Sequence, residues 1–96
     1  MKNPVHRGRL ANEIARVLSE TLLYEARDEA LSCVTILRVE LSGNGQEALV
    51  YYSANQEWEK ASAALERARG FLRSRVAQEM RLRWVPRLTF VPEEPW

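Results

Sequence analysis

The stretch that decides the fold is Ala64-Leu-Glu-Arg-Ala-Arg-Gly-Phe-Leu-Arg-Ser-Arg75, which places a glycine inside a strong helical pattern and surrounds it with arginines. Across residues 56–82, apolar side chains recur at steps of three or four residues. A glycine in a helix interior costs about 1 kcal/mol relative to alanine, and a helix of about 25 residues is unusual in so small a domain. We therefore predict two helices that meet in a tight kink at Ala68-Arg69-Gly70.

Positive charge gathers in the same region. Residues 67–87 hold one acid, Glu79, and seven arginines, at positions 67, 69, 73, 75, 81, 83 and 87. This window carries a formal charge of +6, whereas the whole chain of 96 residues carries +1 at pH 7. A concentrated basic surface on a small protein is typical of nucleic-acid binding. The alternative is that these arginines only solvate the surface of a helix.

The remaining segments alternate between helical and strand-like patterns. Residues 9–27 read as a helix after an extended lead-in at Asn3-Pro4, and residues 33–42, 48–53 and 87–91 read as strands. Turn-forming residues at 42–46 join the first two strands as a hairpin, and we expect Leu37, Val39 and Leu41 to face the core. The order α-β-β-α-α-β predicts an α+β fold of two layers, with helices on one face of a three-stranded sheet.

The composition indicates one domain with little provision for catalysis. We expect a single domain over residues 1–96, with an ordered core at 5–92 and short terminal arms. No run approaches the about 20 apolar residues that cross a bilayer, and the single cysteine, Cys33, excludes an internal disulfide. His6 is the only histidine and Asp28 the only aspartate, so a catalytic triad or a metal centre finds no support. We therefore expect no enzyme activity, no cofactor, no metal and no membrane partner.

The glycine and its arginines define a candidate RNA-binding site. Arg69 and Arg73 are four residues apart and share a helix face, and Arg67 and Arg75 extend the charge to either side. A tight corner at Gly70 would also expose backbone N–H groups to phosphate at the start of the next helix. The predicted RNA-binding residues on this segment are Arg67, Ala68, Arg69, Gly70, Arg73 and Arg75.

Two further features are open to more than one interpretation. Arg7 and Arg9 lie in a basic N-terminal arm, which binds RNA if the first helix lies near the kink; a frayed terminus is the alternative. We expect Trp84 to pack where the last helix meets the third strand, with stacking on an RNA base as the alternative.

Seven segments share their pattern, in order, with one protein family. They include His6-Arg-Gly-Arg-Leu-Ala-Asn-Glu-Ile14, Val34-Thr-Ile-Leu-Arg-Val-Glu-Leu-Ser42, Gly70-Phe-Leu-Arg-Ser-Arg-Val-Ala77 and Leu82-Arg-Trp-Val-Pro-Arg-Leu-Thr-Phe90. Over about residues 6–91 the chain resembles bacterial ribosome-binding factor A. The resemblance implies a type II KH-like domain in which an Ala-x-Gly kink replaces the usual Gly-x-x-Gly loop. Arg87 departs from the family pattern, which commonly has glutamate there.

The resemblance also implies a function. It implies a cytoplasmic assembly factor that binds the immature small (30S) ribosomal subunit, contacts 16S rRNA, supports late maturation and 5′-end processing, and leaves before translation. The family is associated with growth in the cold, and we expect a monomer when the protein is free. Two alternatives to this function stay open, a generic KH-like RNA-binding module and a protein-interaction module whose basic helix face meets an acidic partner.

Overall fold

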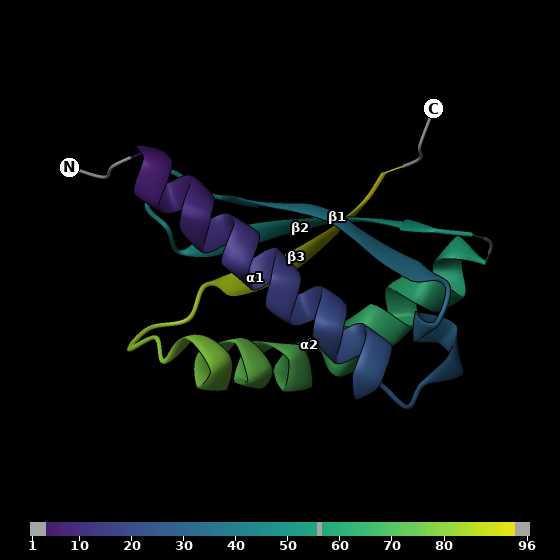
Figure 1. The fold of residues 1–96 in the computed structure, drawn as a ribbon. Coiled ribbons are helices and arrows are strands. Elements are labelled where there is room, and N and C mark those ends of the chain that lie inside the picture. Colours follow the sequence, from purple (N-terminus) through teal and green to yellow (C-terminus); the bar gives the residue numbers. More distant parts are fainter. Residues whose placement is uncertain (1–3, 56, 94–96) are drawn as a thin grey trace.

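Two helices cover one face of a three-stranded sheet (Figure 1) in the computed structural model, which describes residues 4–55 and 57–93, with side chains from Gly8 onward. The elements follow in the order α1 (Pro4–Tyr24), the short 3-10 helix η1 (Glu29–Leu31), β1 (Val34–Leu41), β2 (Glu47–Ala54), α2 (Trp58–Met80) and β3 (Arg87–Pro92). The predicted α+β architecture of two layers is therefore confirmed.

The central strand of the sheet is β2, which pairs antiparallel with β1 and parallel with β3. Gly45 supplies the positive φ, 74°, that the β1–β2 turn needs. A parallel neighbour cannot be reached through a tight turn, so α2 carries the chain back along the sheet between β2 and β3. The start of β3 then lies beside the β1–β2 turn, where the Arg87 N–H donates to the Gln46 carbonyl over 3.0 Å.

The core lies between the helices and the sheet, on the faces that the helical and strand periods predict. Each fully buried aliphatic or aromatic side chain contributes roughly 1.5–3 kcal/mol to folding. The largest fully buried side chains are Tyr52, Ile14, Leu18, Leu65, Leu72, Leu88, Val17, Val50, Val76 and Thr21.

The first helix, α1, begins earlier than the sequence predicts. Pro4, expected in an extended lead-in, is the first residue of the helix. Proline suits this position because the first helical N–H groups have no partner within the helix and the fixed φ of proline fits it. Arg7 and Arg9 therefore belong to the first turns of α1 rather than to a free arm. The side chain of Arg7 lies outside the described residues.

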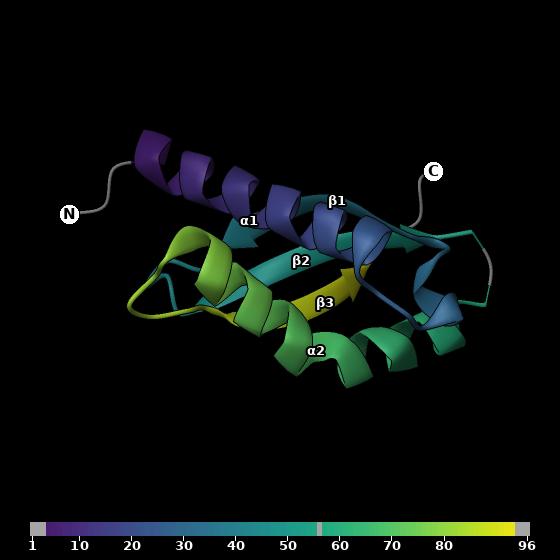
Figure 2. The same ribbon diagram turned by 60° about the horizontal axis from the view of Figure 1, so that its bottom comes forward.

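The second helix, α2, is continuous, so the predicted order with two separate helices at Ala68-Arg69-Gly70 is wrong. The helix runs from Trp58 to Met80 through Gly70, which keeps a negative φ. Its ribbon bends near the middle without breaking (Figure 2). The burial of Leu65 and Leu72 against the sheet outweighs the about 1 kcal/mol that an interior glycine costs. Packing therefore holds one helix together across the glycine.

The predicted alternation in β1 is broken at one residue. The pairing of β1 with β2 shifts register between Ile36 and Arg38, so Leu37 is the extra residue of a β-bulge. The expectation that Leu37 faces the core is wrong, since this side chain is 41% exposed. Val39 is buried and Leu41 is half-buried, as predicted.

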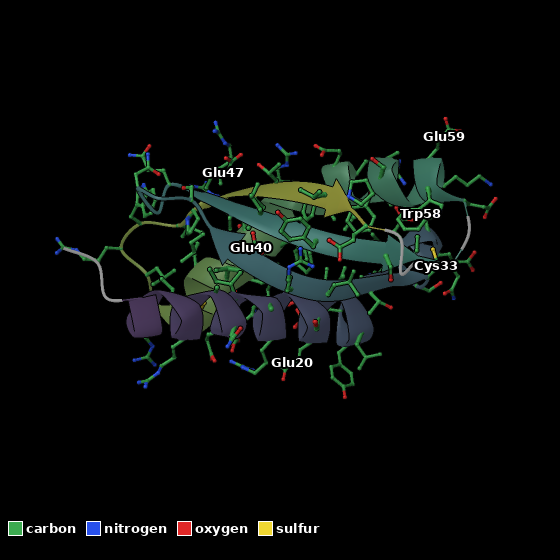
Figure 3. All side chains as sticks on the ribbon, turned by 90° about the horizontal axis from the view of Figure 1, so that it is seen from above. Glu20, Cys33, Glu40, Glu47, Trp58 and Glu59 are labelled. Atoms are coloured by element: carbon green, nitrogen blue, oxygen red, sulfur yellow. The ribbon has the colours of Figure 1, made fainter. Side chains whose placement is uncertain are left out.

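The sheet face opposite the helices carries charges of both signs. Arg38 donates to Glu40 over 3.1 Å and to Glu93 over 2.8 Å, and its Cζ lies 4.0 Å from the centre of the Tyr51 ring. Figure 3 shows Glu40 and Glu47 on this face. The open face of the sheet thus contrasts with the arginine-rich surface of α2.

Candidate nucleic-acid interface

Arg67, on the exposed side of α2, is tied to the segment that follows α1. Its Nη2 donates to Asp28 Oδ2 over 2.7 Å, and its side chain is 63% exposed. Asp28 also caps η1, because its Oδ1 accepts the Ala30 N–H at 3.0 Å. The Arg67 guanidinium and then the Ala30 N–H hold the pKa of Asp28 below its ordinary value. Arg67 therefore joins α2 to η1 while most of its side chain faces solvent.

Arg75 is the most enclosed of these arginines, with a side chain only 26% exposed. Its Nη2 donates to Glu25 over 2.9 Å and to Glu79 over 3.2 Å, and its Nη1 donates to Gln78 over 2.8 Å. Glu25 directly follows the last residue of α1. Arg75 is therefore a cross-link between α1 and α2.

Arg69 and Arg73 lie on the other flank of α2, toward β3. Arg69 donates to the Glu66 carboxylate over 2.6 Å, and its Cζ lies 5.8 Å from the centre of the Phe90 ring. Arg73 donates through Nη2 to the Val85 carbonyl over 2.9 Å and through Nε to the Pro86 carbonyl over 3.4 Å. Arg73 therefore holds the backbone of the loop between α2 and β3.

The four arginines do not form one group that points outward together. At about 100° per helical residue, Arg67 and Arg75 lie about 80° apart and Arg69 and Arg73 about 40° apart. The midpoints of the two pairs lie about 180° apart around the helix axis. The pairs therefore occupy opposite flanks of α2, one toward α1 and the other toward β3. Each of the four guanidiniums has a partner, either an acid one helical turn away on α2 or a group in a neighbouring segment.

Small side chains occupy the solvent side of α2 between these flanks. Ala63, Gly70 and Ser74 are exposed, and a Cβ built on Gly70 would meet nothing within 4 Å. Ala68, by contrast, is half-buried and packs against the core. The middle of α2 thus presents to solvent a strip of small residues with arginines on both sides. Ala68 lies on the opposite, core-facing side of the helix.

An open groove of about 780 Å³ borders Arg67. The end of α1, residues 25–28 and the middle of α2 line it, together with the rings of Tyr24 and Phe71, which are 78% and 45% exposed. Aromatic rings beside a guanidinium are suited to stacking on a nucleic-acid base.

Five arginines have exposed side chains that form no hydrogen bond or ion pair within the described part of the chain. They are Arg9, Arg27, Arg81, Arg83 and Arg87. Arg9 does not approach the middle of α2, because about 24 Å of helix separates it from Glu25. The N-terminal end of α1, to which Arg9 belongs, lies instead at the end of the molecule that also holds the loop between α2 and β3 (Figures 1 and 2).

Residues 81–87 belong to the basic window of the sequence but are not among the predicted site residues. Within the described part of the chain, the guanidiniums of Arg81, Arg83 and Arg87 form no hydrogen bond or ion pair, whereas those of the predicted arginines on α2 do. The absence of any acid between Glu79 and Glu93 is the feature of the sequence that distinguishes them. Among the residues that the structure describes, no three His, Cys, Asp or Glu side chains gather closely enough to hold a metal ion. No described helix is long and apolar enough to span a membrane.

The fold and this surface define a class of protein, a small α+β domain with an arginine-rich helix on one face of its sheet. Comparison with known proteins then gives the family. The family model described as ribosome-binding factor A matches residues 6–95. The chain therefore belongs to the ribosome-binding factor A family, which confirms the resemblance seen in the sequence.

Relatives agree with this assignment. Ribosome-binding factor A of Methylobacillus flagellatus is 43% identical over 84 residues, which cover 86% of this chain and 67% of the relative. The protein of the same name from Heliobacterium modesticaldum is 40% identical over 89 residues, which cover 90% of this chain and 74% of the relative.

Two known structures share the fold. The crystal structure of ribosome-binding factor A from Thermus thermophilus aligns with a TM-score of 0.82 at 35% identity, and the alignment covers 90% of this chain and 94% of that one. A homology model of the Thermus thermophilus factor, fitted into the cryo-EM map of a 30S–RbfA complex, aligns with a TM-score of 0.76 at 35% identity. That alignment covers 88% of this chain and 92% of the fitted chain.

Proposed function

We propose that this protein is a non-catalytic assembly factor that binds the small (30S) ribosomal subunit in the cytoplasm through its 16S rRNA. In this role it supports late maturation of the subunit and processing of the rRNA 5′ end. The observation that carries the proposal is the similarity to the Thermus thermophilus factor fitted into a 30S complex, at 35% identity with 88% of this chain covered.

The ion pairs of α2 do not oppose RNA binding. Arg67 and Arg69 hold their acids at the surface, where such a pair contributes only about 0–1 kcal/mol. The Nε of Arg69 is buried without a hydrogen-bond partner among the described residues. Because Nε is buried, a phosphate would bind Arg69 through the Nη atoms, in place of Glu66. Phosphate oxygens can therefore replace Asp28 and Glu66 as acceptors at little cost.

The residues of the predicted site then divide into two roles. Arg67 and Arg69 bind phosphates from the two flanks of the exposed strip, and Gly70 lets the RNA backbone approach the helix because no side chain stands there. Arg73 and Arg75 act as positioning residues, since one holds the loop before β3 and the other holds the end of α1.

The contacts of Asp28 support the proposal that the protein is not a catalyst. Asp28, the only aspartate, is held by Arg67 and by the Ala30 N–H. These contacts keep its pKa low, which suits a structural cap and opposes service as a proton donor near neutral pH.

Binding of purified small subunits tests the proposal. We expect the double variant Arg67→Gln, Arg69→Gln to bind at least about tenfold more weakly, because hydrogen bonds to charged groups are worth about 1.5–3 kcal/mol each. The slope of log affinity against log salt concentration should also become shallower, by about 0.7–0.9 for each lost phosphate contact. Arg38→Gln is the control, since it removes an arginine with two ion pairs from the open sheet face. Equal losses in the two variants, or no loss in either, would contradict the proposed site.

A further inference from the structure

The loop between α2 and β3 is anchored to the rest of the fold and displays an aromatic ring. Trp84 is 52% exposed, so the expectation that it packs between the helix and the strand is wrong. Its neighbours Leu82 and Val85 pack against the core instead, and Pro86 is buried. The loop is therefore anchored by these apolar side chains while the indole stays in solvent.

Hydrogen bonds fix the backbone of this loop at its C-terminal end. Arg73 donates to the carbonyls of Val85 and Pro86, and the Arg87 N–H donates to the Gln46 carbonyl. A ring held on an ordered backbone loses little conformational freedom when a ligand stacks on it. The exposed indole is thus preorganised for binding.

The charge around Trp84 selects the kind of ligand. Arg81, Arg83 and Arg87 are exposed, and their guanidiniums form no hydrogen bond or ion pair within the described residues. No acid lies between Glu79 and Glu93 in the sequence. The N-terminal end of α1, which carries the free Arg9, lies at the same end of the molecule (Figures 1 and 2). An exposed indole among free guanidiniums matches a polymer of alternating bases and phosphates.

We propose that residues 81–87 form a binding site for single-stranded RNA, in which an unpaired base stacks on the Trp84 indole and Arg81, Arg83 and Arg87 bind the adjoining phosphates. The inference rests on the proposed function and adds a second RNA contact, separate from the strip on α2. A paired base cannot offer its face to the indole, so the site favours unpaired segments over duplex RNA.

The test is the affinity of the whole protein for a fluorescently labelled single-stranded RNA of about ten nucleotides and for its duplex. Trp84→Ala should weaken binding of the single strand about 5- to 140-fold, the range that corresponds to about 1–3 kcal/mol per stacked base. Trp84→Phe should keep most of the affinity, and Leu37→Ala, which removes an exposed apolar side chain from β1, should change nothing. The affinity for the duplex should be the same with and without Trp84.

The charged part of the site has its own readout. The triple variant Arg81→Gln, Arg83→Gln, Arg87→Gln should lower the slope of log affinity against log salt by about 2 for the single strand, at about 0.7 per phosphate contact. Indole fluorescence should be quenched by the RNA in wild type, and this quenching should be lost in Trp84→Phe. A triple variant with an unchanged slope would overturn the inference.

Binding to purified small subunits separates this inference from the function on which it rests. If Trp84→Ala binds both RNA and small subunits as tightly as wild type, the inference is wrong and the proposed function stands. If Trp84→Ala loses only the small subunits, the indole contacts a protein and the inference is also wrong. If wild type binds neither RNA nor small subunits, the proposed function fails and the inference fails with it.

Discussion

Replacing Gly70 with alanine should stabilise the protein although the substitution falls at the centre of the proposed RNA surface. Gly70 has a negative φ inside α2, and an added Cβ would meet no atom within 4 Å. The substitution therefore brings neither backbone strain nor a clash. Alanine favours a helix interior over glycine by about 0.8–1.0 kcal/mol, partly because it restricts the unfolded chain.

Thermal unfolding followed by circular dichroism measures this gain. An unfolding entropy of about 2.1 cal/mol/K per residue, over 96 residues, converts 1 kcal/mol into a rise in Tm of about 5 °C. Gly45→Ala is the matched control, because Gly45 has a φ of 74° that alanine adopts only with strain. We expect Gly70→Ala to raise Tm and Gly45→Ala to lower it.

The same variant should bind RNA more weakly, since its methyl group stands where the RNA backbone approaches α2. A higher Tm together with weaker RNA binding would show that the glycine at position 70 serves RNA binding and not folding stability. If Gly70→Ala lowers Tm as Gly45→Ala does, the bend of α2 needs a conformation that alanine cannot adopt. That result would refute our account of the helix.

Three further predictions follow from individual contacts. Arg73→Met should speed amide hydrogen exchange in residues 82–85 while α1 is unaffected, because the loop loses its two side-chain hydrogen bonds; unchanged exchange would mean that the apolar anchors suffice. Arg67→Met should raise the pKa of Asp28, followed by NMR, but not fully to its ordinary value, because the Ala30 N–H remains. In wild type this low pKa stabilises the fold above the unfolded-state pKa of Asp28, about 3.9, and the effect is lost as the pH falls through the folded-state pKa. Leu65→Ala, at a fully buried site, should cost about 2–5 kcal/mol in urea unfolding, and a loss below about 1 kcal/mol would contradict the central position of this side chain.

The layer architecture could be predicted because apolar residues repeat at the correct period in each element. Leu65, Leu72 and Val76 on α2 are all buried as their spacing requires. The start of α1 and the continuity of α2 differ from the prediction because proline and glycine usually interrupt helices, but here they do not. Pro4 suits a helix start, and the cost of Gly70 is smaller than the burial on either side of it.

The candidate site was harder to predict than the fold. The count of arginines was informative, but their directions depend on partners far away in the sequence. Glu25 and Asp28 lie in the segment that follows α1 and bind Arg75 and Arg67 only because the helices pack together. The exposure of Trp84 depends likewise on the way its neighbours turn toward the core.

Cross-linking of the protein to purified small subunits by ultraviolet light, with the linked peptides identified by mass spectrometry, tests the central claim most directly. We predict that peptides covering residues 66–75 and 81–87 become linked to 16S rRNA, while those of the open sheet face, such as residues 38–40 and 47–51, do not. Cross-links confined to the sheet face, or confined to ribosomal proteins, would contradict the account.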